Sequence, residues 1–521
     1  MGEAHVLYGR VDQSIRLQGG IMSDITTTRR RFVGAAAVAG IGVGLEAATA
    51  RATTPQEWNL EADIVVCGLG IAGIGAAMQA AQDGARVIVL EKQPPETAGG
   101  DTMCNNGGVF WTNTMVENLR VNSMGEWDEQ LCQEYYEEGL LIKPFLEEGG
   151  ATWMLESDQV DIVNGLGPAF YEAALAGFDG CGAEVHYETP AKELVCDPES
   201  GEVLGVLAEK DGKPIAVKAA QAVILTTGGY PANQGLLKQL NLGGDMDYYS
   251  IGSPYLQGDG LKMACSVGAS LANLWRGWEP DYPVCKAASE ELGTGISLAR
   301  PEHFVQPSYI YVNGQGKRYW NESTFMTHWK NDTYGQVAYN NYAYNNKPSF
   351  LVFDQACFEA QSVGNTQWSY GYGRLSPTEA YIWSDDNSAE LERGWIKKAD
   401  TLEELAELVG IDPEGLVAEV ERYNGFCAAG LDEDFGRTDN VPLGEGPYYA
   451  IEQGVCVIYT IGGLRTDAQS RVLDWNGEPI PRLYSAGNIG QGVYVIPVGL
   501  QGAWIAGRRG ARDAVTLEPW G

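Results

Sequence analysis

The segment from Ala62 to Lys92 reads ADIVVCGLGIAGIGAAMQAAQDGARVIVLEK and decides the fold prediction for this chain. Its apolar runs, Ile64 to Cys67 and Val87 to Leu90, predict two buried parallel strands. The small residues from Ile74 to Ala81 lie between these runs and predict a helix. A strand, a tight turn, a helix and a second strand therefore follow one another, and Glu91 stands at the end of the second strand.

Three glycines in this segment have the spacing G-x-G-x-x-G. Gly68 permits a sharp turn, Gly70 lets backbone N–H groups approach a pyrophosphate, and Gly73 lets the helix pack closely against the strand. Glu91 follows Gly73 by eighteen residues, where a carboxylate can accept hydrogen bonds from ribose hydroxyls. The glycine pattern alone also occurs in structural turns. Together with the strands, the helix and the acid it indicates a dinucleotide-binding unit.

The composition limits the classes of protein to which this chain can belong. The chain has 521 residues, 44% of them hydrophobic, which is enough for a large core and two or three compact units. The net charge of −34 disfavours binding to nucleic acid and to anionic membranes, although acidity spread along the chain also serves solubility alone. No apolar run is long enough to span a bilayer.

The ten cysteines do not form a recognisable site. No two of them stand in a C-x-x-C pair, and no Cys/His cluster has metal-ligand spacing. They are expected to be small buried residues, with neither a disulfide framework nor an iron–sulfur, zinc or other metal site. The motif C-x-x-C-H is also missing, so no c-type haem is expected on this chain.

The N-terminal region has the pattern of an export signal. The sequence TRRRFV from Thr28 to Val33 precedes the weakly hydrophobic GAAAVAGIGVG, and Ala48-Thr49-Ala50 follows. This order resembles a twin-arginine signal with an A-x-A cleavage site, and Met22 is a plausible start. The alternative is a chance basic cluster before an apolar stretch. We expect residues 1–50 to be a signal region and the protein to be exported across the cytoplasmic membrane.

Further glycine-rich segments follow the first unit. Gly99-Gly100-Asp101-Thr102 and Asn105-Asn106-Gly107-Gly108 predict backbone wrapped around a flat ligand, although either segment alone is typical of a plain loop. Glu126 to Gly149 predicts a helix, and Val185 to Thr189 predicts a strand. Glu193 to Val217 alternates apolar and polar residues around two turns, which predicts a three-stranded meander.

A series of motifs carries a family resemblance. The apolar strand Ala222 to Leu225 ends in TTGG, GDG begins at Gly258, and VNGQGKRYWNE runs from Val312 to Glu322. YNGF then begins at Tyr423, GGL at Gly462 and LYSAGN at Leu483. With the first unit and Gly99-Gly100, these motifs resemble the FAD-dependent fumarate reductase/succinate dehydrogenase flavoprotein superfamily. The resemblance is to its soluble branch, which includes fumarate and urocanate reductases and 3-ketosteroid Δ1-dehydrogenases.

The resemblance implies an α/β fold of two domains. A Rossmann-like FAD-binding domain with a parallel sheet and a β-meander would comprise residues 55–287 and 441–521. An inserted α+β cap domain that holds substrate would occupy residues 288–440. Within the cap we expect a strand from Tyr309, a Gly turn and a second strand, and helices opened by the capping box TLEE at Thr401 and by Asp412-Pro413. A second strand connecting the cap to the FAD-binding domain is expected from Cys456 to Ile461, and the last helix from Pro497.

The resemblance also implies which residues bind FAD. No His follows Gly99-Gly100, where succinate dehydrogenases attach the flavin, so noncovalent FAD is expected. The N-terminal N–H groups of the last helix would lie near N1 and O2 of the flavin. The expected FAD-binding residues are Gly68, Gly70, Ala72, Gly73, Glu91, Lys92, Gly99, Gly100, Asp101, Thr102, Gly107, Gly108, Ala191, Thr227, Gly228, Gly229, Asp259, Gly487, Asn488, Val498, Gly499 and Leu500.

Three charged positions of the fumarate reductases are apolar in this chain. The family's proton-donating Arg falls at Met326, its carboxylate-binding His at Ile458, and its carboxylate-binding Arg at Val498. An anionic substrate would be desolvated there without a partner, at a cost of roughly several kcal/mol. This argues against fumarate and largely against urocanate, unless the alignment slips by a residue.

A tyrosine is the leading candidate for proton transfer. The ketosteroid dehydrogenases carry a catalytic Tyr eight residues before a Gly of the last helix, and this position is Tyr494. A phenol there would transfer a proton or bind a ketone, but Tyr494 could equally be a packing aromatic. Tyr459 and His328 lie close to matched positions and are further candidates, and Met326 occupies the donor position itself.

Three hypotheses of function follow. The first is reduction of an activated C=C bond in a largely uncharged, aromatic or polycyclic substrate, with electrons from a separate cytochrome or quinol-linked donor. The second is the reverse chemistry, a ketosteroid-type desaturation. The third is a flavin module for electron relay or ligand binding without bond chemistry of its own.

Overall fold

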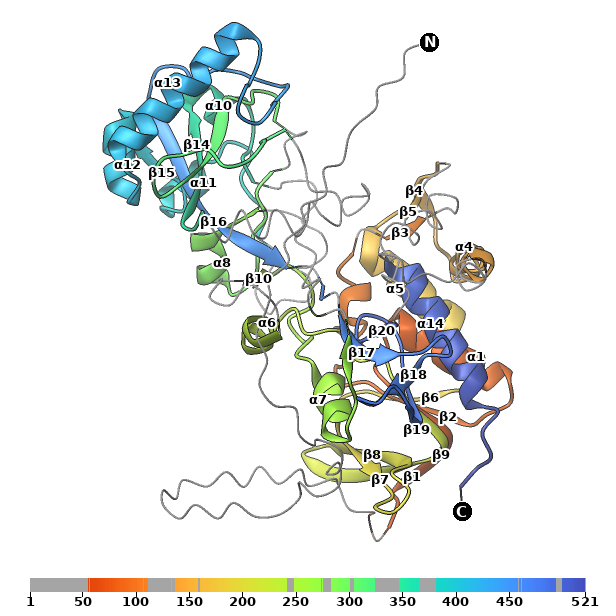
Figure 1. Cartoon of the computed structure of the whole chain (residues 1–521). Coiled ribbons are helices and arrows are strands. Elements are labelled where there is room, and N and C mark those ends of the chain that lie inside the picture. Colours follow the sequence, from red (N-terminus) through yellow and green to blue (C-terminus); the bar gives the residue numbers. More distant parts are fainter. Residues whose placement is uncertain are drawn as a thin grey trace, which may run out of the picture. The chain divides into compact units, whose positions relative to one another are not determined.

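The computed structural model describes most of the chain beyond the N-terminal region (Figure 1). The described residues are 55, 57–105, 107–110, 133, 136–157, 160–240, 248–272, 274, 283–299, 304–323, 346–364, 381–457, 459–460, 462–492 and 499–520. The predicted signal region and the candidates Met326, His328, Tyr494 and Val498 lie outside them.

A mixed sheet of eleven strands contains the predicted nucleotide-binding unit. β1 (Leu60–Cys67) lies between β2 (Val87–Leu90) and β9 (Lys213–Leu225), and both pairs are parallel. β6 (Glu184–His186) extends the sheet beyond β2, and β19 (Pro479–Ser485) extends it beyond β9, again in parallel. The predicted Rossmann-like fold is confirmed by this strand order.

The same sheet holds the predicted meander. β7 (Ala191–Cys196), β8 (Val203–Lys210) and β9 pair in antiparallel succession. The remaining strands of the sheet are β11 (Leu271–Ala272), β17 (Gly463–Thr466), β18 (Arg471–Leu473) and β20 (Gly490–Gly492).

Apolar residues on both faces of β1 explain its central position. Ile64 and Val66 belong to a buried cluster with the helices α1 (Ile71–Gln82) and α14 (Gly499–Ala514), whereas Val65 and Cys67 belong to a second cluster with the meander. A strand covered on both faces reads as a continuous apolar run rather than an alternating one. The main helices of this part are α1 (Ile71–Gln82), α5 (Leu166–Phe178), α6 (Gln234–Leu240), α7 (Asp259–Ser266) and α14 (Gly499–Ala514).

The cap is built around a second, six-stranded sheet. Its central strand, β16 (Tyr448–Val457), pairs antiparallel with β14 (Ser349–Asp354) and parallel with β10 (Tyr248–Ser250). This sheet therefore extends beyond residues 288–440 on both sides. Its other elements are β12 (Pro283–Cys285), α8 (Lys286–Leu292), β13 (Tyr309–Asn313), α10 (Gln355–Ala360), α11 (Ser388–Glu392), β15 (Lys397–Ala399), α12 (Leu402–Val409) and α13 (Pro413–Ala429).

Two predictions about the cap strands are wrong. β13 does not form a hairpin with the residues that follow its Gly turn, because only an isolated bridge joins Val312 to Arg318 and the ladder partner of β13 is β14. The connecting strand predicted from Cys456 to Ile461 is β16, which begins at Tyr448 and ends at Val457. In both cases a distant partner strand, rather than the local pattern, decides where the strand lies.

The helix starts agree better with the sequence. α12 begins after Thr401, whose hydroxyl accepts the Glu404 N–H at 3.1 Å, and α13 begins at Pro413 after Asp412. α1 begins at Ile71, earlier than predicted, because Gly70 already serves as its extended N-cap. The described part of the stretch from Glu126 to Gly149 includes the helix α4 (Ile142–Glu148). Near α4, β3 (Gly108–Phe110), β5 (Val160–Val163) and β4 (Trp153–Leu155) form a small antiparallel sheet.

The described residues contain neither a membrane-spanning helix nor a cluster of metal ligands. None of the helices found there combines the length and the apolar character needed to cross a bilayer. No group of three or more His, Cys, Asp or Glu residues in the same parts of the chain is arranged to hold a metal ion.

A buried ionic cluster joins β13 to the end of α13. The Arg318 guanidinium contacts the Glu322 carboxylate at 2.6 Å and that of Asp432 at 2.9 Å, and Arg437 lies 3.8 Å from Glu322. The side chains of all four residues are fully buried. Arg318 also lies over the ring of Tyr423, 4.7 Å from its centroid. Each charge has a partner of opposite sign, so the cluster is balanced.

Removing one charge from this cluster should destabilise the protein. We expect Glu322→Gln to cost about 3–5 kcal/mol, because it leaves buried guanidinium charge uncompensated. Urea unfolding of the two proteins checks this. The control is Asp434→Asn, whose partner Arg422 is 55% exposed, and it should leave the unfolding curve nearly unchanged. Equal effects of the two substitutions would contradict the assigned role of burial.

Candidate functional site

The turn between β1 and α1 is closed by direct backbone contact. Gly68 has a φ of +106°, and a Cβ added there would lie 2.6 Å from the carbonyl oxygen of Thr226. A Cβ at Gly73 would lie 2.0 Å from the carbonyl oxygen of Gly68. The Thr226 hydroxyl lies 2.9 Å from the Cys67 carbonyl oxygen and 2.8 Å from that of Gly68. Only glycine fits at Gly68 and Gly73, as the predicted turn requires.

The loop Gly99–Thr102 faces the start of α1. The Ile71 N–H donates to the Thr102 hydroxyl at 3.0 Å. A Cβ at Gly70 would lie 3.3 Å from this hydroxyl and 3.4 Å from the Gly99 carbonyl oxygen, so the two segments are in close contact. A helix N-terminus beside glycine backbone is suited to bind a pyrophosphate.

Glu91 lies beneath the same turn. Its carboxylate accepts the Leu69 N–H at 2.8 Å and the Gln93 N–H at 2.9 Å. Burial raises the pKa of Glu91, and these backbone hydrogen bonds oppose the rise. Its neighbour Lys92 forms an ion pair with Asp259 at 2.7 Å and donates to the Tyr255 carbonyl oxygen. Each oxygen of Glu91 keeps a lone pair with which it can accept a ribose hydroxyl.

The TTGG segment lies at the carboxyl end of β9. Gly228 has a φ of +69° and packs on Leu256, whose side chain also lies 3.4 Å from a Cβ added at Gly100. A Cβ at Gly229 would lie 2.1 Å from the Thr460 hydroxyl, which accepts the Tyr230 N–H at 3.2 Å. This contact brings the segment that contains Tyr459 and Thr460 to the glycine pair.

The segment that follows β19 completes the arrangement. Gly487 has a φ of +79°, and a Cβ there would lie 3.1 Å from that of Ala72 in α1. Asn488 hydrogen-bonds through its side chain to Asp101. The structure thus brings together predicted FAD-binding residues from the first strand–helix unit, the Gly99–Thr102 loop and the chain after β19.

Two buried polar atoms at this place have no partner among the described residues. They are the Thr227 hydroxyl and one carboxylate oxygen of Asp101, Oδ2. Buried polar atoms are normally hydrogen-bonded, so these two atoms fit a site that holds a large polar ligand. The neighbouring glycines, where an added Cβ would clash with surrounding atoms, leave room for such a ligand. The residues present therefore fit FAD, with Glu91 placed for the ribose and the start of α1 for the diphosphate.

The other predicted residues are placed as follows. Gly107 packs with a φ of +68° against the backbone of Leu166, and Gly108 begins β3. Ala191 begins β7, and Gly499 and Leu500 begin α14. Tyr459 is described and half-buried. The remaining catalytic candidates and Val498 lie outside the described residues, so their roles stay predictions.

Three residues of the site were missed in the sequence. Tyr171 in α5 donates its hydroxyl to the Leu69 carbonyl oxygen at 3.0 Å, and Ser253 donates its N–H to Asp101 at 2.9 Å. Thr226 supports the first turn. None of these contacts has a local sequence signal, except that Thr226 is the first residue of TTGG and directly precedes the three residues predicted to contact FAD.

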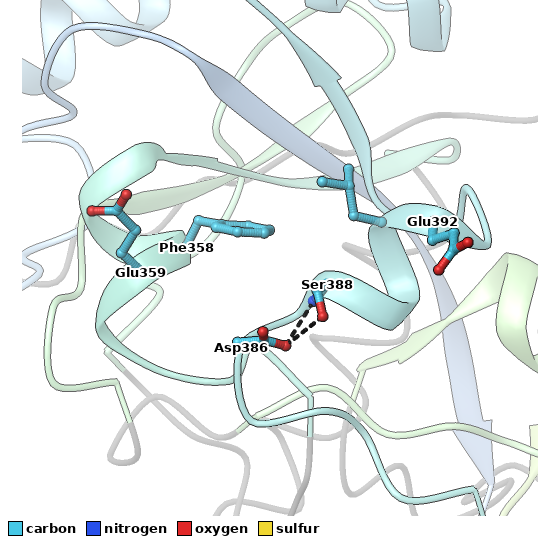
Figure 2. A pocket seen from close by; sticks show the side chains of 6 residues that line it. Phe358, Glu359, Asp386, Ser388 and Glu392 are labelled. Atoms are coloured by element: carbon cyan, nitrogen blue, oxygen red, sulfur yellow. Dashed lines mark hydrogen bonds between the residues drawn. The ribbon is translucent and has the colours of Figure 1, made fainter.

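One surface pocket of about 490 Å³ lies in the cap. It is lined by Phe358, Glu359, Asp386, Ser388, Leu391 and Glu392. Figure 2 shows Asp386 hydrogen-bonded to the N-terminus of α11, where it accepts the Ser388 N–H at 3.1 Å and the Ser388 hydroxyl at 2.6 Å. None of the residues that line this pocket is a predicted site residue, and we assign no function to the pocket.

Comparison with known families decides the cofactor. The family described as FAD binding domain matches residues 117–496, which is well over half of the chain. The chain belongs to this FAD-binding family. The family described as FAD dependent oxidoreductase also matches residues 63–160, which contain the β1–α1–β2 unit. The protein is thus an FAD-dependent oxidoreductase, and its cofactor is FAD.

Similar proteins span most of the chain. A vinyl phenol reductase of Lactiplantibacillus plantarum is 27% identical over 464 residues, 83% of this chain and 90% of the relative. A fumarate reductase (cytochrome) of Shewanella frigidimarina is 28% identical over 460 residues, 83% of this chain and 72% of the relative. The structure of a 3-ketosteroid Δ1-dehydrogenase from Sterolibacterium denitrificans superimposes with a TM-score of 0.70 at 21% identity, covering 88% and 99% of the two chains. At this identity the last comparison shows the fold alone.

Proposed function

We propose that this FAD-dependent oxidoreductase reduces an activated C=C bond in a largely uncharged substrate. The observation that carries the proposal is the loss of charge at three positions, because Met326, Ile458 and Val498 stand where fumarate reductases have Arg, His and Arg. A dicarboxylate bound there would lose its hydration without gaining a cation. An enone, or an alkene conjugated to an aromatic ring, needs no such partner.

The residues of the chain have separate tasks in this reaction. FAD, when bound, would supply the hydride for this reduction. Tyr494 gives a proton to one carbon of the double bond and regains it from solvent, so that the C=C bond becomes CH–CH. The glycine turns, Glu91 and the start of α1 hold the cofactor in place while this happens.

The similar proteins support an uncharged alkene. Vinyl phenol, named for the Lactiplantibacillus plantarum relative, has a C=C bond conjugated to a neutral phenol ring. The relative named for fumarate is about equally similar, so overall similarity does not separate the substrates, and the proposal rests on the three apolar positions. A second candidate is ketosteroid-type desaturation, which the position of Tyr494 before the last helix favours.

The path of electrons and the location of the protein are part of the proposal. Electrons come from a separate donor, a cytochrome or quinol-linked protein, because the sequence has no haem-attachment motif. FAD is bound noncovalently, so acid precipitation should release it into the supernatant. The TRRRFV segment directs export by the twin-arginine route, and changing Arg29 and Arg30 to Lys should retain the protein in the cytoplasm.

An anaerobic substrate panel tests the proposed reaction. The holoenzyme is supplied with a reduced low-potential dye and with enones, vinylarenes, enoates, fumarate and urocanate, and the products are identified by mass spectrometry. We expect saturated products from uncharged conjugated alkenes. Bleaching of the flavin by a 3-ketosteroid without any donor would favour the desaturase instead. If no compound of the panel is converted, both the reductase and the desaturase proposals fail.

A further inference from the structure

Asp101 is an acid of the FAD site that forms no ion pair among the described residues and keeps one buried oxygen without a hydrogen-bond partner there. It is the middle residue of the turn Gly100–Thr102, next to the hydroxyl that accepts the first N–H of α1. Its oxygen Oδ1 accepts the Ser253 N–H at 2.9 Å, and the Asn488 side chain also hydrogen-bonds to the carboxylate. Oδ2 is buried without a partner in the described parts of the chain.

Other titratable groups near Asp101 do not neutralise it. Cys104 is buried, and burial together with the Asp101 charge raises the pKa of its thiol well above the usual range. Tyr171 lies against Gly99, and burial raises the pKa of its phenol, so both groups stay uncharged near neutral pH. Lys92 is committed to Asp259 and to the carbonyl oxygen of Tyr255.

We propose that Asp101 takes up a proton when FAD binds, so that the affinity for FAD depends on pH. The diphosphate of FAD brings two negative charges to the start of α1, beside the turn that holds Asp101. An ionised carboxylate there would repel them in a buried place, where charges interact strongly. A protonated Asp101 removes the repulsion, and its O–H at Oδ2 becomes a donor for an oxygen of the cofactor.

The pKa of Asp101 places this uptake of a proton near neutral pH. Burial raises it to about 7, against the hydrogen bonds from Ser253 and Asn488. Bound FAD raises it further, because the diphosphate adds negative charge. FAD binding is therefore tightest below the pKa of the free site and weakens as the pH rises above it, by roughly tenfold per pH unit until the pKa of the bound state is reached. The inference rests on FAD binding and not on the proposed substrate.

Equilibrium dialysis of the holoenzyme against FAD tests the inference without any substrate. For the wild-type protein, we expect the Kd for FAD to be constant below about pH 6 and to rise roughly tenfold per unit above about pH 7. Asp101→Asn should remove this rise, because the amide still accepts the Ser253 N–H but does not titrate. At pH 9 the variant should bind FAD more tightly than the wild type, by roughly tenfold or more.

A matched substitution separates Asp101 from other acids of the site. Asp259→Asn removes a carboxylate that is already paired with Lys92, so it should change the Kd but keep the pH dependence. Should Asp101→Asn not fold, Asp101→Ser provides a second uncharged variant. A wild-type Kd that does not vary with pH, or a pH dependence retained in either Asp101 variant, would overturn the inference. The wild-type measurement alone is decisive in the first case.

Discussion

Gly73→Ala is expected to yield a protein that does not retain FAD. The added Cβ would lie 2.0 Å from the Gly68 carbonyl oxygen and 2.9 Å from the Thr226 hydroxyl. Backbone atoms cannot move aside as a flexible side chain can, so α1 must shift away from β1. Such overpacking costs about 1–3 kcal/mol or more, and it also moves the helix N-terminus that is suited to bind the diphosphate. The ratio of flavin to protein absorbance after gel filtration measures the loss.

The control is a glycine-to-alanine change where there is room. Gly425 lies in the interior of α13, on its exposed side, and a Cβ there meets nothing within 4 Å. Gly425→Ala should retain full FAD and raise the stability by about 0.5–1 kcal/mol, because alanine loses less entropy in a helix. Normal FAD content in Gly73→Ala would show that the turn is not the cofactor cradle.

Tyr494→Phe is expected to lower kcat by roughly 10²-fold or more. A positioned general acid contributes about 10²–10⁴-fold to a rate, and phenylalanine keeps the ring but cannot give a proton. FAD content and the binding of substrate should change little, so the loss falls on kcat rather than on KM. Steady-state kinetics with the best alkene of the panel checks this, with the flavin spectrum as a test of intact binding.

Two parallel substitutions identify the proton donor among the candidates. Tyr459→Phe removes a hydroxyl in the neighbouring segment, and His328→Gln removes the imidazole. We expect neither to approach the loss in Tyr494→Phe. If Tyr494→Phe turns over at the wild-type rate and one of the others does not, Tyr494 is a packing residue and the donor is reassigned.

Sequence patterns predict this protein best where the interactions are local. The β1–α1–β2 unit could be predicted because Gly68, Gly73 and Glu91 each act within thirty residues of one another. The start of α12 follows in the same way from Thr401 and Glu404. The partner of β13 could not be predicted, since β14 begins only at Ser349 and the Gly turn after β13 imitates a hairpin.

The candidate FAD site could likewise be predicted only where its contacts are local in the sequence. The glycines mark where a backbone must approach closely, so the sequence indicates most of the cradle. Tyr171 and Ser253 meet it through contacts across more than a hundred residues of sequence, and no local motif predicts them. Whether the Asp101 oxygen Oδ2 has a partner depends on which side chains surround it, and only the three-dimensional arrangement shows this.

The most direct test of the account compares an uncharged alkene with a diacid in one experiment. The holoenzyme is reduced without oxygen, freed of excess reductant and mixed with 4-vinylphenol, an uncharged enone or fumarate, while the flavin absorbance is followed. The account predicts that at least one uncharged alkene restores the oxidised spectrum and that fumarate leaves the flavin reduced. Rapid reoxidation by fumarate, with no response to the uncharged alkenes, would contradict it.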